Sequence, residues 1–154
     1  MSKNIDYLKS QAQKLFKDYK TQGWYQDVPD GSIYFMYSPV YFDIERIFFD
    51  YKLDNEHQKN FTLMKAQHLI SQILGFKKWT DLINASTAEI ELARLLWDNQ
   101  HKIHLENWKM YVAQIEAENN TTLDAESRLA IFKRVFADVN GHQSQFGDYR
   151  LKKH

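Results

Sequence analysis

Apolar side chains recur every three or four positions along most of this chain, which is the spacing of one buried helix face. Ile5, Leu8 and Ala12 begin the first such stripe, while Lys17 and Asp18 lie outside it and are expected to face solvent. The same periodicity predicts about six helices. The expected segments are residues 4–22, 38–51, 62–74, 86–100, 105–119 and 121–139.

Short signals at the helix ends agree with this pattern. Ser86-Thr87-Ala88-Glu89 has the spacing of a capping box, in which Ser86 and Glu89 each satisfy a backbone N–H of the other. Thr62 is expected to begin a helix that Gly75 stops, and a second short helix is expected from about Trp79.

Three other boundaries rest on the same chemistry. Ser38-Pro39 has the order of an N-cap followed by Pro in the first helical turn. Residues 55–60 are expected to be a polar connector. Thr121 or Thr122 is expected to cap the last helix, with Asp124 in its first turn.

Two segments differ from the rest in their pattern. The expected helix at 86–100 is apolar over most of its circumference, so it is predicted to be the central helix of the fold. Residues 24–37 are the least helical part, and Val28-Pro29-Asp30-Gly31 is a good turn sequence flanked by strand-favouring residues. An irregular segment or a small hairpin is therefore expected there.

The composition favours helices over a sandwich or barrel. Five Gly and 2 Pro among 154 residues leave few positions for tight turns. A chain of this length fits one domain. The predicted fold is all-α: a single compact domain over residues 1–154, built as a bundle of about six helices.

Charge and Cys content exclude several classes of function. Twenty Lys and Arg balance 20 Asp and Glu, so no net field attracts a polyanion and nucleic-acid binding is not expected. Without Cys there is no disulfide framework, thiolate nucleophile or Cys-ligated zinc. There is no signal-peptide core, and no apolar run approaches the ~18 residues that a membrane span needs. A soluble cytoplasmic protein with no membrane partner is expected.

Aromatic residues supply the first candidate site. They gather in and after the least helical segment, and amphipathic aromatics are enriched at the centres of protein interfaces. The alternative is that they cover the core of a helical domain. The candidate partner-binding residues are Trp24, Tyr25, Tyr34, Tyr37 and Tyr41.

Polar residues near the helix junctions supply the second candidate site, for a small ligand. Its candidate residues are His68, Asp98, His101 and His104. Imidazole groups three positions apart can share a metal with a carboxylate, and a lone His can act as a base near neutral pH. Solvated or locally hydrogen-bonded histidines are the simpler interpretation, because no Cys, Ser or paired acid stands at a telling spacing. No catalytic residue, metal site or cofactor is predicted.

A short internal segment resembles a known helical module. Residues 61–82 are similar to a module of bacterial proteins labelled as glyoxalase-related, which also occurs at the start of some ankyrin-repeat proteins. The matching positions are Ala66, Gln67, Ile70, Gly75, Phe76, Trp79 and Leu82. More broadly, the chain resembles small bacterial proteins that continue into a run like Leu92–Gln100. The resemblance implies a packing module and a bacterial origin, and it implies no glyoxalase activity.

These observations favour a non-catalytic function. We expect a bacterial protein that binds another protein through the aromatic segment, as immunity proteins, antitoxins and inhibitors do. The alternative is a small enzyme or ligand-binding protein with a cleft near His68, Asp98 and His101. No Gly-rich phosphate loop, dinucleotide fingerprint, zinc-protease helix or nucleophile elbow occurs in the sequence.

Overall fold

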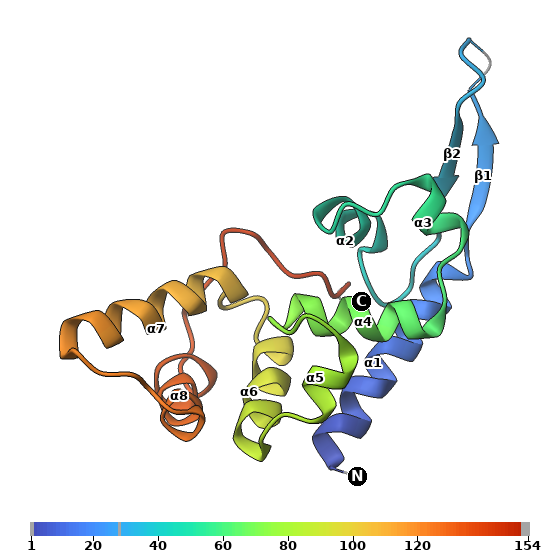
Figure 1. Ribbon diagram of the computed structural model, residues 1–154. Coiled ribbons are helices and arrows are strands. Elements are labelled where there is room, and N and C mark those ends of the chain that lie inside the picture. Colours follow the sequence, from blue (N-terminus) through green and yellow to red (C-terminus); the bar gives the residue numbers. More distant parts are fainter. Residues whose placement is uncertain (1, 28, 152–154) are drawn as a thin grey trace. The chain divides into compact units, whose positions relative to one another are not determined.

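The computed structural model describes residues 2–27 and 29–151. This part of the chain is mostly helical and contains one antiparallel sheet of two strands (Figure 1), so a broadly helical fold is confirmed and a purely all-α fold is not. The sheet is the hairpin expected near residues 24–37, although Val28 of its turn lies outside the described residues.

The chain divides into two compact units. Unit 1 comprises Met1–Leu8 with His68–Asp148, and unit 2 comprises Lys9–Gln67 with Tyr149–His154. The expectation that the whole chain forms a single domain stays a prediction. It can be tested by measuring whether the chain unfolds in one cooperative transition.

Helix α1 (Lys3–Tyr19) contributes to both units and buries the expected stripe that begins with Ile5 and Leu8. It ends at Tyr19, earlier than the expected boundary. Thr21 explains the early end, because its backbone N–H and its hydroxyl both donate to the carbonyl of Asp18, at 3.2 and 2.7 Å. The chain then leaves the helix and enters the hairpin.

The remaining elements of unit 2 are short. They are β1 (Gly23–Gln26), β2 (Ile33–Met36), α2 (Ile44–Asp50), α3 (Asn55–Lys59) and the first turn of α4 (Leu63–Ile73). The polar connector expected at residues 55–60 was therefore a wrong prediction, since most of it is α3. Asp54 caps this helix by accepting a hydrogen bond from the backbone N–H of His57 at 3.1 Å.

A buried carboxylate overturns two predictions made for unit 2. Asp18 is only 1% exposed instead of facing solvent. Its oxygens accept hydrogen bonds from the backbone N–H groups of Val40, Tyr41 and Phe42 at 2.8, 2.9 and 2.7 Å. These bonds hold the segment before α2 outside a helix, so α2 begins at Ile44 with Asp43 as its N-cap, and the predicted helix start at Ser38 is wrong.

Aromatic rings fill much of the interior of unit 2. Phe61 lies with its ring centroid 5.0 Å from that of Tyr19 and 5.2 Å from that of Phe48. Tyr37 joins the same group, at 5.7 Å from Phe48. Pairs at such separations stabilise beyond the area that they bury, by about 0.5–1.5 kcal/mol each.

The end of the described chain pairs with the segment before α2. Asp43 N–H donates to the carbonyl of Tyr149 at 2.7 Å, and Leu151 N–H donates to the carbonyl of Tyr41 at 2.9 Å. The Tyr149 hydroxyl donates to Asp50 at 2.6 Å. Residues 149–151 thus belong to unit 2 through backbone pairing, although they follow all of unit 1 in the sequence.

Unit 1 contains the second half of α4 and the elements after it. These are α5 (Trp79–Ile83), α6 (Thr87–Asp98), α7 (Leu105–Asn119), α8 (Ala125–Phe132) and the π-helical turn η1 (Lys133–Ala137). The predicted stop after α4 is confirmed: Gly75 has φ +93°, and the N–H of Phe76 donates to the carbonyl of Ser71 at 2.9 Å. This is the bond of a Schellman motif, which needs a left-handed residue.

The start of α6 also follows the prediction. Glu89 N–H donates to the Ser86 hydroxyl at 3.2 Å, and Ser86 N–H donates to the Glu89 carboxylate at 3.3 Å. The helix buries Ile90, Leu92, Ala93, Leu96 and Trp97. The predicted cap of the last helix is wrong, because Asp124 accepts from the N–H of Ser127 at 2.8 Å in place of either Thr.

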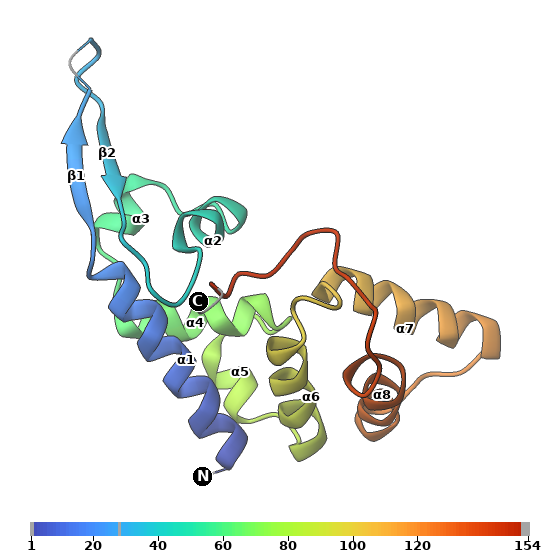
Figure 2. The ribbon, with the colours of Figure 1, turned by 180° about the vertical axis from the view of Figure 1, so that it is seen from behind.

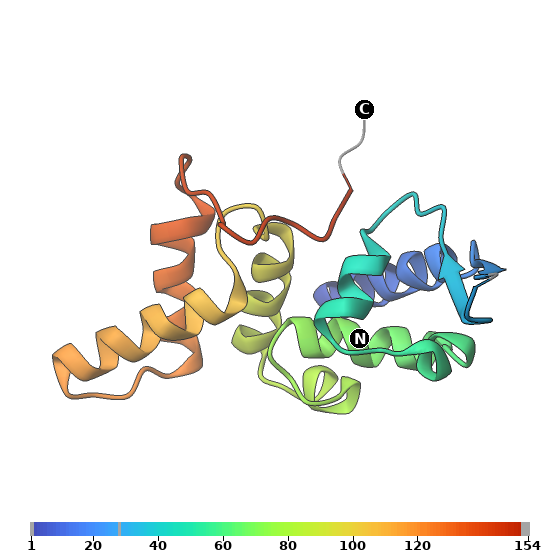
Figure 3. The ribbon, with the colours of Figure 1, turned by 90° about the horizontal axis from the view of Figure 1, so that it is seen from above.

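The helices at the end of unit 1 meet through aromatic rings. Trp108 of α7 lies edge-on to Phe132 of α8 and Phe136 of η1, with centroids 5.0 and 5.9 Å apart. Figure 3 shows α7 in light orange and α8 in dark orange, joined by the loop at residues 120–124. Asn120 enters this loop with φ +47°, the left-handed conformation that ends α7.

Within residues 2–27 and 29–151, no helix is both long enough and apolar enough to cross a membrane.

Candidate functional site

The hairpin of unit 2 displays side chains on two faces. Its register pairs Gly23 with Met36, Trp24 with Phe35, Tyr25 with Tyr34 and Gln26 with Ile33. Directly paired residues share a face, and neighbours along a strand alternate between faces. One face therefore carries Trp24, Gln26, Ile33 and Phe35, and the other carries Gly23, Tyr25, Tyr34 and Met36.

Both faces expose large apolar side chains. Trp24 is 64% exposed, Tyr25 48% and Tyr34 41%, and the rings of the two tyrosines stack with centroids 5.3 Å apart. Ile33 and Met36 are exposed as well. We call the five residues Trp24, Tyr25, Ile33, Tyr34 and Met36 the hairpin surface. Exposed apolar groups gathered on one small element are typical of a binding surface, whereas single ones are ordinary.

A groove of about 490 Å³ lies between the Trp24 face of the hairpin and α3. Asn55 joins the two elements, because its side-chain amide donates to the carbonyl of Ile33 at 2.9 Å. The residues that line the groove are Trp24, Gly31, Ile33, Phe35, Asn55, Glu56 and Lys59.

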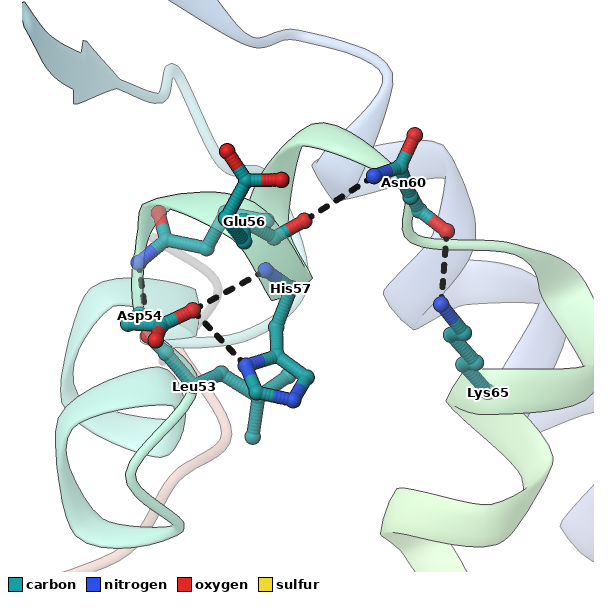
Figure 4. Close-up of polar contacts among 7 residues, drawn as sticks. Leu53, Asp54, Glu56, His57, Asn60 and Lys65 are labelled. Carbon is teal, nitrogen blue, oxygen red and sulfur yellow. Dashed lines mark hydrogen bonds and ion pairs between the residues drawn. The ribbon is translucent and has the colours of Figure 1, made fainter.

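Polar contacts fix α3 beside the groove (Figure 4). Asp54 accepts a hydrogen bond from the backbone N–H of His57 at 3.1 Å and contacts the His57 ring nitrogen at 2.7 Å. These contacts lower the pKa of Asp54, so its carboxylate is ionised at neutral pH. At the other end, Asn60 donates to the Glu56 carbonyl at 3.2 Å and accepts from the Lys65 ammonium at 3.0 Å.

Tyr37 anchors the base of the hairpin. Its hydroxyl donates to the Gln58 side-chain oxygen at 2.9 Å and accepts from the Gln22 side-chain amide at 2.9 Å. Burial raises the pKa of Tyr37 from 10.0 to about 12. Gln58 also donates to the carbonyl of Leu53 at 2.9 Å, so these contacts link the hairpin to the start of α3.

The five predicted partner-binding residues thus occupy different places. Trp24, Tyr25 and Tyr34 lie together on the hairpin, while Tyr37 is half-buried at its base. Tyr41 lies in the segment held by Asp18, with the Lys14 ammonium 5.4 Å from its ring centroid. Tyr37 and Tyr41 are placed to support the fold of unit 2.

The hairpin region is acidic in a neutral chain. Residues 21–45 contain no Lys or Arg, although the chain has 20 of them. The turn end carries Asp27 and Asp30, and hydrogen bonds from Ser32 lower the pKa of Asp30. The turn end of the hairpin is therefore negatively charged at neutral pH.

The four predicted ligand-binding residues all lie in unit 1. His68 contacts the side-chain amide of Gln72 at 3.0 Å, one turn further along α4. Asp98 accepts from the Tyr7 hydroxyl at 2.5 Å and pairs with Arg94 at 3.7 Å. These contacts are of the kind that hold helices in place.

The other two histidines have structural contacts too. His104 is the N-cap of α7, where its ring nitrogen accepts from the N–H of Glu106 at 3.2 Å, and its ring lies 4.9 Å from that of Phe146. The carbonyl of His101 accepts from Ser144 N–H at 2.9 Å. Among the described residues, no three His, Asp or Glu side chains form a group that could hold a metal ion.

Sequence reasoning missed several residues of the candidate site. Ile33 and Met36 belong to the hairpin surface, and Asn55, Glu56 and Lys59 line the groove. Ile33 and Met36 lie on opposite faces of β2, so the alternation of a strand alone does not select them, and only their exposure in the folded hairpin does. Asp54 could have indicated the start of α3, because Asp is a preferred N-cap residue whose side chain accepts a hydrogen bond from a backbone N–H two or three residues further on.

Comparison with known proteins adds no assignment: no family model, curated protein or solved structure matches this chain.

Proposed function

We propose that this chain is a non-catalytic module that binds another protein through the hairpin surface. The observation that carries the proposal is the exposure of Trp24, Tyr25 and Tyr34 on one short hairpin. Aromatic side chains contribute large contact areas at a small cost in conformational entropy, and they dominate the energies of many protein interfaces.

The setting that we propose is the bacterial cytoplasm, with an immunity, antitoxin or inhibitor role. The absence of Cys supports it, because small extracellular domains commonly depend on disulfides. The resemblance of residues 61–82 supports only the bacterial origin. We propose that this segment serves packing, in keeping with the buried positions of Ala66, Ile70 and Leu82.

The test is capture of partners from nuclease-treated native lysate, read by mass spectrometry. Trp24→Ala is expected to abolish capture of a stoichiometric partner while leaving the melting temperature within about 2 °C, because an exposed side chain contributes little to stability. Phe49→Ala is the matched control, since Phe49 is 82% exposed but lies in α2. The proposal fails if both variants capture the partner as well as the natural chain does.

A further inference from the structure

The two edges of the hairpin differ in what covers them. Figures 1 and 2 both show β2 between β1 and α3. Asn55 of α3 donates to the carbonyl of Ile33, so the outer edge of β2 already has a hydrogen-bonding neighbour. The outer edge of β1 is on the opposite side of the sheet.

The register identifies which backbone groups point outward from β1. Asp27 N–H donates to the carbonyl of Ser32 at 2.8 Å, so this pair is a hydrogen-bonded one. Hydrogen-bonded and non-hydrogen-bonded pairs alternate along antiparallel strands, which makes Tyr25–Tyr34 the next bonded pair. The N–H and C=O groups of Trp24 and Gln26 therefore point away from β2. In residues 2–27 and 29–151 these outward groups have no hydrogen-bonding partner.

Such an edge is a template for one more strand. An extended segment beside β1 would exchange on the order of four backbone hydrogen bonds with Trp24 and Gln26. Its side chains would stand beside Trp24 on one face and beside the stacked Tyr25 on the other. The segment must therefore have apolar or aromatic residues at positions that meet these rings.

The acidic residues at the turn end of the hairpin indicate the charge expected of the added strand. The added strand would end near Asp27 and Asp30, and residues 21–45 of the sequence around them contain no Lys or Arg. The Lys59 that lines the groove belongs to α3, on the β2 side of the hairpin (Figure 1). β1 itself, Gly23–Gln26, carries no charged side chain, so a second copy of this strand would supply no cation of its own to these carboxylates. A Lys or Arg satisfies the carboxylates, and an Arg can also lie over the exposed tyrosine rings.

We infer that β1 binds an extended, positively charged segment of another protein by strand addition at its outer edge. The inference rests on the proposed function and specifies the mode of binding and the chemistry of the partner. The backbone contacts of such a complex provide affinity, while the aromatic rings and the acidic end provide selectivity.

The test uses a displayed library of random peptides, about 12 residues long, selected on the full chain. Enriched peptides are expected to alternate apolar with polar residues and to be rich in Lys and Arg. One enriched peptide, synthesised, is expected to bind Gln26→Pro at least about tenfold more weakly, because Pro removes an outward N–H and blocks the edge. Gln26→Thr is the matched control: it loses the same side-chain bond to the Gly31 carbonyl but keeps the N–H.

A second measurement needs no variant. Peptide binding is expected to slow hydrogen exchange of the Trp24 and Gln26 amides by about tenfold or more, while Tyr25, already paired within the hairpin, changes little. The inference is overturned if no peptide is enriched, if enriched peptides are acidic, or if binding leaves these two amides unprotected. A dimer of the chain that Gln26→Pro disrupts would also overturn it, by assigning the edge to a second copy.

The lysate experiment separates this inference from the proposed function. A partner whose capture requires Trp24 but tolerates Gln26→Pro leaves the hairpin surface as a binding site and removes strand addition. A partner lost with both variants and kept by Gln26→Thr supports both.

Discussion

Replacing Asp18 by Ala is expected to destabilise unit 2 more than any other single change near the hairpin. The Asp18 carboxylate is 1% exposed and accepts three backbone hydrogen bonds, from Val40, Tyr41 and Phe42. The Phe42 N–H is buried, whereas the other two are partly accessible to water. Removing the acceptor leaves the buried donor unsatisfied.

The magnitude follows from that difference. An unsatisfied buried donor costs roughly 2 kcal/mol, and exchanging each of the two accessible bonds for water costs about 1 kcal/mol. The expected loss is about 4 kcal/mol of unfolding free energy, a large share of the 5–15 kcal/mol typical of a domain. At about 2–4 °C per kcal/mol, the melting temperature should fall by on the order of 10 °C.

Urea unfolding followed by circular dichroism measures the effect. Asp18→Asn is expected to recover only part of the loss, because its amide group places a donor against backbone donors. Gln13→Ala, at an exposed position of α1, is the control and should change the free energy by no more than about 0.5 kcal/mol. A loss below about 1 kcal/mol for Asp18→Ala, with an unchanged denaturant slope, would refute the reasoning.

Three further predictions concern local structure. Gly75→Ala should cost about 1–2 kcal/mol in thermal unfolding, because φ is +93° there and a Cβ would stand 3.3 Å from Leu105; an unchanged melting curve would contradict this. Ser86→Ala should cost about 1 kcal/mol, while Ser86→Asp, which keeps a capping oxygen, should cost less. In an alkaline titration read at 295 nm, Tyr37 should ionise late, at about pH 12, and Tyr37→Phe should remove one late-titrating group. The pKa of Tyr37 in the folded protein lies above the ordinary tyrosine value of 10.0, so the contribution of its neutral hydroxyl to stability is complete below pH 10 and is lost as the pH rises through 12. If the natural protein and Tyr37→Phe showed the same number of late-titrating tyrosines, the assignment to Tyr37 would be wrong.

The aromatic segment at residues 24–41 shows which residues of the candidate site can be predicted from the sequence and which cannot. The amphipathic chemistry of Trp24, Tyr25 and Tyr34 predicts a binding role, and all three side chains are exposed on the hairpin. Tyr37 is equally aromatic but is half-buried, because Gln22 and Gln58 bind its hydroxyl. Exposed and buried aromatics have the same chemistry, so only their neighbours in space distinguish them.

The sequence by itself determined the features whose partners lie within a few residues. The capping box of Ser86 and Glu89 and the helix stop at Gly75 depend on atoms three to five positions away. Periodic apolar stripes predicted α1 and α6 for the same reason: the spacing of the residues already contains the geometry of the helix.

Only the tertiary structure decided what distant segments do to each other. Asp18 belongs to α1 by its position in the sequence, yet its carboxylate binds backbone groups more than twenty residues away and keeps residues 40–42 out of a helix. Likewise, α3 covers the edge of β2 through Asn55 and leaves that of β1 open. Local propensity cannot predict either arrangement, because the hydrogen-bonding partners are brought together only when the chain folds.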